Sequence, residues 1–187
     1  FRSGGLLSGG ISVGRTVNDS CAVVDDPEDA RPDFCVSAPR WSSQARYTLN
    51  FIYPMPWGIQ ASANYQNTPG LAITATRNFT NAEIAPSLGR NLSACPTNTG
   101  TCTQTVSIAM IPTNADTQYE ARQQQLDVRL TKRVTIGGAR LSGNFDVYNL
   151  LNASGITGRS NTWGSSWGRP TGIQSARLFK VGASIDF

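Results

Sequence analysis

Histidine is absent from this chain of 187 residues. Histidine is the side chain that most often acts as a general base near neutral pH, and it is the commonest metal ligand. A nucleophile would therefore have to rely on a lysine or a carboxylate, and neither Lys132 nor Lys180 lies in a recognisable catalytic arrangement. We expect a protein that is not an enzyme and binds no cofactor.

Long apolar runs and clusters of basic residues are also missing. No apolar stretch approaches the roughly 18 residues of a membrane-spanning helix, which leaves only the shorter, two-faced strands of a barrel as a way across a membrane. The 16 lysines and arginines are scattered singly, so nucleic acid is not an expected partner. No shift in composition divides the chain, and we treat residues 1–187 as a single domain. The sequence starts at Phe1 without a signal peptide, which indicates a processed chain or a piece of a longer one.

Four cysteines form two close pairs, Cys21 with Cys35 and Cys95 with Cys102, each in a polar, turn-rich segment. We expect two short disulfide loops, and therefore an oxidising compartment. Four free thiols are the alternative, and zinc is a weaker one because the spacings do not fit. The acidic run from Asp25 to Asp29 could bind calcium, but Pro27 and the irregular spacing favour a solvated loop.

The last segment, residues 175–187, has the period of a β-strand. One face carries five apolar residues: Phe179, Val181, Ala183, Ile185 and Phe187. The other face is polar or small. A strand of this kind that closes on an aromatic residue is typical of bacterial outer-membrane barrels, whose apolar face meets lipid and whose polar face lines the lumen.

Five earlier segments show the same alternation: 11–18, after a flexible glycine-rich lead at 3–10, then 45–53, 57–66, 119–136 and 141–147. Residues 71–75 could continue the third of them beyond a bend, and 105–111 alternates briefly. We expect tight turns at Pro54-Met55-Pro56 and Gly137-Gly138, and long irregular loops at 18–40, 78–103 and 152–171. The pattern predicts an all-β, antiparallel meander of about six strands, a partial outer-membrane β-barrel with short turns at one end and long disulfide-clipped loops at the other. A soluble β-sandwich is the alternative.

The predicted barrel assigns roles to particular side chains. We expect membrane-interface aromatics at Tyr53, Trp57, Trp163 and Trp167, with loop packing as the alternative for the last two. Lys132 is the one charged residue on the apolar side, near a strand end where its stem could reach a headgroup. On the polar side we expect ion pairs among Arg129, Arg133, Asp127 and Asp146.

Four segments resemble the C-terminal end of TonB-dependent outer-membrane receptors, most closely the Oar-like group with a carboxypeptidase-regulatory-like domain: residues 124–133, 144–152, 167–171 and 177–187. The resemblance implies a 22-stranded barrel around an N-terminal plug, and nutrient uptake driven through TonB. This chain contains neither a plug nor a TonB box, so it would be one part of such a receptor. The resemblance further implies that the last strand, with Phe187, is the signal read by the barrel assembly machinery.

Six strands leave two open edges, and an unpaired edge is costly in lipid. We therefore expect the partners to be outer-membrane lipid together with either the remaining strands and plug of a receptor or identical copies of this chain. In the second case a processed fragment would polymerise through its strand edges into an extracellular fibre or tube. A third hypothesis is a soluble, lectin-like binder that uses the tryptophan loop.

Overall fold

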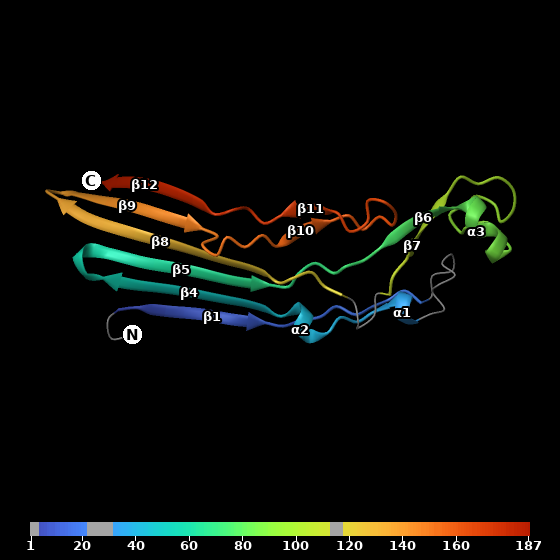
Figure 1. Cartoon of the computed structure of the whole chain (residues 1–187), viewed down its shortest axis with the longest axis horizontal. Helices are drawn as coiled ribbons and strands as arrows, with labels where there is room; N and C mark the ends of the chain where they lie inside the picture. Colours follow the sequence, from blue (N-terminus) through green and yellow to red (C-terminus); the bar gives the residue numbers. More distant parts are fainter. Residues whose placement is uncertain (1–3, 22–31, 113–117) are drawn as a thin grey trace.

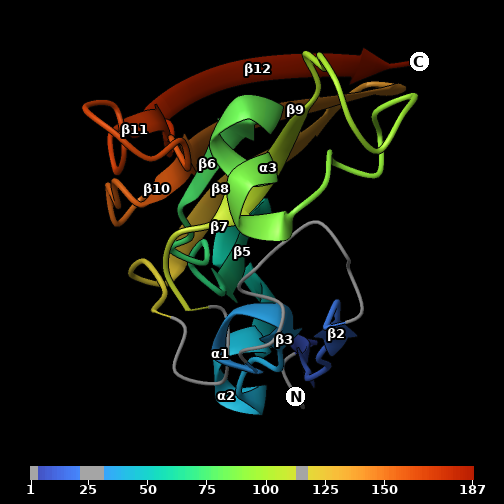
Figure 2. The same ribbon diagram turned by 90° about the vertical axis from the view of Figure 1, so that its right-hand side faces the viewer.

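The computed structural model describes residues 4–21, 32–112 and 118–187. The acidic run from Asp25 to Asp29 lies outside these residues. Six strands form one antiparallel sheet in chain order: β1 (Leu6–Ser12), β4 (Arg46–Met55), β5 (Ile59–Thr68), β8 (Gln123–Ile136), β9 (Ala139–Tyr148) and β12 (Leu178–Asp186). The sheet curves but does not close into a barrel, and β1 and β12 are its two edges (Figures 1 and 2). The predicted six-stranded meander is confirmed.

The connections differ sharply between the two ends of the sheet. At one end, the turn η2 (Pro56–Gly58) joins β4 to β5, and Gly137-Gly138 joins β8 to β9. The three long connections all leave from the opposite end (Figure 1). They contain β2 (Asn18–Asp19), α1 (Pro32–Cys35), β3 (Val36–Ser37) and α2 (Trp41–Gln44); then β6 (Thr76–Thr80), α3 (Asn81–Leu88) and β7 (Thr105–Ala109); then β10 (Ile156–Arg159) and β11 (Pro170–Ile173).

The first strand lies earlier than its sequence predicts. Gly9 and Gly10, expected in a flexible lead, pair with Leu49 and Thr48 of β4. A Cβ at Gly9 would lie 2.5 Å from the Thr48 carbonyl oxygen, so glycine fits where the two strands approach closely. Pairing with β4 thus outweighs the low strand propensity of glycine.

The first tight turn also differs in detail. We expected Pro54 to end its strand, but Pro54 pairs with Gln60, and Met55 with Ile59. Pro54 lies beyond Ile52, the last β4 residue that pairs with β1, so no ladder bond is lost on that side. Trp57, expected to begin the next strand, lies in η2 with a φ of 63°.

The long connections are more regular than expected. The 105–111 strand is present as β7, but it pairs with β6 outside the main sheet, and Ala72 bridges Tyr119 instead of extending β5. The helix α3 begins with a capping box between Thr80 and Glu83. Three buried residues, Ile84, Leu92 and Ile108, form a small core for this β6–α3–β7 module.

Candidate functional site

The six strands share one continuous apolar face. A single row crosses the whole sheet in register: Leu7, Phe51, Ala63, Val128, Val147 and Phe179. The helices and small hairpins lie beyond the end of the sheet and do not cover this face (Figures 1 and 2). Val181 consequently has 79% of its surface exposed. This face is a broad apolar surface, which monomeric soluble proteins rarely expose.

The residues expected to form the assembly signal lie on this face. Phe179, Val181, Ala183 and Ile185 are all exposed on the apolar side of β12, and Phe187 follows the strand. The ring of Phe179 on β12 stacks on that of Phe145 on the neighbouring strand β9, with centroids 6.1 Å apart. The structure places these residues together, and their role in assembly stays a prediction.

The opposite face is polar and hydrogen-bonded from strand to strand. Arg129 of β8 forms an ion pair with Asp146 of β9, as expected. Two residues nearer the hairpin end, Thr131 donates to Asn144 Oδ1 at 2.8 Å. The other expected charge contacts differ, because Asp127 accepts from Gln125 and from a backbone N–H, and Arg133 pairs with no carboxylate among the residues that the structure describes.

The hairpin end carries two of the four expected interface aromatics. Trp57 is 81% exposed in η2, and its carbonyl accepts a hydrogen bond from Lys132 Nζ. Lys132 thus directs its charge to the rim, as its position near the strand end predicts. Tyr53 lies on the apolar face of β4 and stacks on Phe51, with centroids 6.1 Å apart.

The other two aromatics lie among the long connections. The rings of Trp163 and Trp167 are 5.2 Å apart, and Trp167 Nε1 donates to the Thr74 carbonyl at 3.0 Å. Trp163 N donates to the Thr76 carbonyl at 2.8 Å. These tryptophans therefore bind the β10–β11 loop to the start of β6 and to the residues just before it, which is the loop-packing arrangement. A role for them at a membrane interface is untested.

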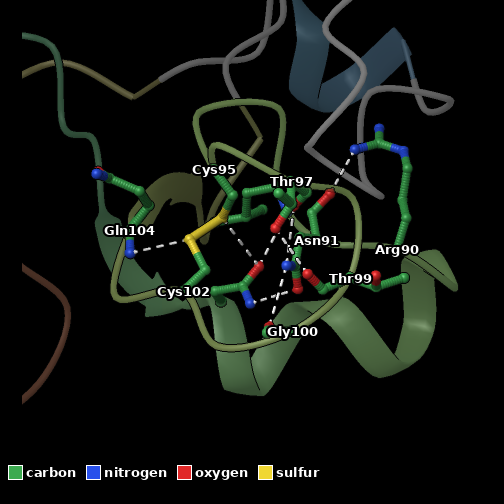
Figure 3. Close-up of a disulfide and its surroundings, with 10 residues drawn as sticks. Arg90, Asn91, Cys95, Thr97, Thr99, Gly100, Cys102 and Gln104 are labelled. Carbon is green, nitrogen blue, oxygen red and sulfur yellow. Dashed lines mark hydrogen bonds between the residues drawn. A yellow bond between two sulfur atoms is a disulfide. The ribbon is translucent and has the colours of Figure 1, made fainter.

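Both predicted disulfides are present, Cys21–Cys35 and Cys95–Cys102. The second closes the loop of the β6–α3–β7 module beside Asn91, whose amide donates to the carbonyls of Thr97 and Gly100 (Figure 3). Glu83 accepts hydrogen bonds from the backbone and the hydroxyl of Thr80, which lower the pKa of its carboxyl. This connection is therefore a small folded module held by a covalent bond and a capped helix.

Sequence reasoning missed the side chain that anchors the loop after β9. Asn149 is 3% exposed with a φ of 49°, and its amide nitrogen donates to the carbonyls of Ala153 at 2.9 Å and Ser175 at 2.7 Å. It therefore fixes both ends of the β9–β12 connection. The available signal was an asparagine directly after a strand, where a left-handed conformation is expected.

In the parts of the chain that the structure describes, no three histidine, cysteine, aspartate or glutamate side chains are grouped so that they could hold a metal ion. In those same parts, no helix has the length and apolar character needed to cross a membrane. The fold and its surfaces define an open, curved antiparallel sheet with one exposed apolar face, one hydrogen-bonded polar face and disulfide-clipped connections at one end. Comparisons with family models, with curated proteins and with solved structures find no match to this chain.

Proposed function

We propose that this chain is the C-terminal barrel segment of a TonB-dependent outer-membrane receptor that takes up nutrients. The observation that carries the proposal is the row of apolar residues running in register through all six strands, over which no described helix or hairpin packs. Apolar surface left in water costs roughly 25 cal/mol per Å² relative to burial. Lipid removes that cost without a second layer of protein.

The polar face supports the same proposal. A barrel lumen holds polar side chains in contact with water and with each other, as the Arg129–Asp146 pair and the Thr131–Asn144 bond are here. A soluble β-sandwich would instead bury the apolar face under a second sheet. In the described residues, the small hairpins β6–β7 and β10–β11 lie beyond the sheet and do not supply that layer.

The receptor identity rests on the resemblance of residues 124–133, 144–152, 167–171 and 177–187. Under this proposal β1 and β12 pair with the remaining strands of the barrel, and the plug occupies the side of the polar face. Outer-membrane lipid covers the apolar face, and the barrel assembly machinery reads β12.

The open edges favour one other function. In the described residues, the outer edges of β1 and β12 pair with no strand, so identical copies could add edge to edge and form an extracellular fibre or tube. In a tube the apolar faces would have to meet one another or a membrane.

Site-directed labelling in cells that make the native polypeptide tests the receptor proposal. Ser165→Cys in the exposed β10–β11 loop should react with a membrane-impermeant maleimide on intact cells. Gly138→Cys, at an open turn position with no atom near its Cβ, should react only after the outer membrane is permeabilised. The disulfide-bonded cysteines do not react and give no background.

Equal labelling of both sites on intact cells, or recovery of the polypeptide in detergent-free filaments, would overturn the receptor proposal. The filaments would support the fibre.

A further inference from the structure

A pocket of about 450 Å³ lies on the polar face where the sheet meets the long connections. Its size is within the range of small-molecule sites, roughly 300–1,000 Å³. Its floor comes from β5 and β8, where Gln66 and Gln125 occupy opposed register positions, and its wall comes from the segment around Gln174. Among the residues that the structure describes, no aspartate, glutamate, lysine or arginine lines it.

Four of the five glutamines that line the pocket donate through their amide nitrogens to acceptors of the chain. The amide nitrogen of Gln123 donates to the Ile156 carbonyl at 3.1 Å, and that of Gln174 donates to the Gln124 carbonyl at 3.0 Å. The nitrogen of Gln125 donates to the carboxylate of Asp127 at 2.8 Å. Carbonyl and carboxylate oxygens can only accept, so each glutamine must present its NH₂ to them.

The fourth glutamine, Gln66, is held by a neighbouring side-chain amide instead of a carbonyl or carboxylate. Gln66 Nε2 donates to Asn64 Oδ1 at 3.0 Å, and Asn64 uses its own nitrogen to donate to Asn50. All four carboxamide oxygens are therefore left without a donor from the described chain. The oxygen of Gln174 is buried as well. Buried acceptors are normally satisfied, yet none of the hydroxyls that also line the pocket, on Thr68, Tyr148, Thr157 and Ser175, donates to these oxygens.

The wall of the pocket is held in place before any ligand arrives. Gln174 N donates to the Gly155 carbonyl at 2.8 Å, and Asn149 binds the Ser175 carbonyl at 2.7 Å. Two exposed apolar side chains, Ile173 and Leu178, also line the pocket. A ligand that fits must therefore offer several O–H donors, no formal charge and an apolar face.

We propose that this pocket binds a segment of a neutral glycan, whose hydroxyls donate to the glutamine oxygens and whose C–H face packs on Ile173 and Leu178. An anion would meet only acceptors on the fixed glutamines, and it would find no cation on the lining. The inference deepens the proposed function by naming the substrate class, and it depends on that function only in treating the ligand as transported cargo.

Isothermal titration of the native polypeptide in detergent tests the proposal. The probes are maltotriose, cellotriose and mannotriose, with trigalacturonate as the charged counterpart. We expect one of the neutral trisaccharides to bind with a stoichiometry of one, and trigalacturonate to bind at least ten-fold more weakly. Gln66→Met keeps the length of the side chain but removes its acceptor, and we expect it to weaken binding about ten-fold, the equivalent of one hydrogen bond.

Gln60→Met is the matched control, because Gln60 lies on the same face of β5 but outside the pocket. It is six residues nearer the hairpin end, which is about 20 Å at about 3.3 Å per residue. It should leave binding unchanged. Binding of none of the neutral probes, preference for trigalacturonate, or equal effects of the two variants would overturn the glycan assignment. An outer-membrane polypeptide that binds no neutral probe leaves the receptor proposal intact, and a filament that binds one leaves the pocket intact and overturns the receptor.

Discussion

Arg129 of β8 and Asp146 of β9 lie directly opposite each other in the sheet, and their side chains form an ion pair in which Asp146 is only 4% exposed. Lys180 of β12 lies opposite Asp146 on its other side. A single carboxylate therefore faces a cation on each of the two neighbouring strands. The ion pair joins β8 to β9, and Lys180 places a charge of opposite sign beside it on β12.

Arg129→Gln should lower the resistance of the sheet to heat, because it leaves a buried carboxylate without its principal partner. The measurement is the temperature at which the folded, faster-migrating form is lost on an unboiled denaturing gel. Arg133→Gln is the control, since Arg133 lies on the same face of β8 opposite Ser142. Equal losses of several degrees in both variants would contradict a specific role for the pair.

Val181→Arg tests what covers the apolar face. An arginine on the lipid face near the middle of a membrane costs about 2–4 kcal/mol, whereas a surface substitution in water usually changes stability by less than about 0.5 kcal/mol. Unfolding by urea in lipid vesicles would measure the difference. Gly182→Arg is the control, because Gly182 lies on the polar face with no atom near its Cβ. If Val181→Arg left the free energy of unfolding unchanged, water and not lipid would contact this face.

The Cys95–Cys102 disulfide should stabilise the β6–α3–β7 module without stabilising the sheet. The loop it closes has a sequence separation of 7, for which the chain-entropy estimate is about 2–3 kcal/mol. Replacing both cysteines with serine should speed hydrogen exchange in α3 while leaving β8 and β9 protected. Faster exchange in the sheet as well would show that the module and the sheet unfold as one unit.

Glu83 gives the same module a dependence on pH. Hydrogen bonds from Thr80 lower the pKa of Glu83 below its ordinary value of 4.5. A lowered pKa in the folded state means that the stabilisation is complete above the ordinary value and is lost as the pH falls through the folded value. The first turn of α3 should therefore fray below about pH 4.5, which exchange at the Thr80 amide would measure. Glu83→Gln keeps an acceptor but should remove this dependence on pH.

The sequence was sufficient to predict the six strands, their order and the asymmetry of their connections, because alternation and tight-turn residues are local signals. It placed the ends of the strands less well. Gly9 reads as a loop residue until Thr48 is known to lie against it, and Trp57 shows no sign of its left-handed conformation.

The amide-lined pocket could not be predicted in the same way. Gln66, Gln125 and Gln174 come from three distant segments, and what distinguishes them is the direction in which each carboxamide is held. That direction depends on acceptors such as the Gln124 carbonyl, whose position follows from the register of the sheet. The number and positions of the glutamines in the sequence do not indicate the direction in which each carboxamide is held.

Asn149 and Asn152 allow a last test, because both have left-handed backbone conformations, with φ of 49° and 51°, and both accept through the amide oxygen, but Asn149 also donates through its nitrogen. Asn149 donates through its nitrogen to the carbonyls of Ala153 and Ser175, whereas Asn152 accepts through its oxygen from Arg177 N at 3.1 Å. Aspartate tolerates the same backbone conformation but can only accept when it is ionised. Asn149→Asp should therefore cost about 2 kcal/mol, from two lost hydrogen bonds, and should loosen the wall of the glutamine-lined pocket. Asn152→Asp should cost little. Hydrogen exchange at Gln174 and Ser175 measures both effects, and equal protection in the two variants would show that Asn149 does not hold the wall.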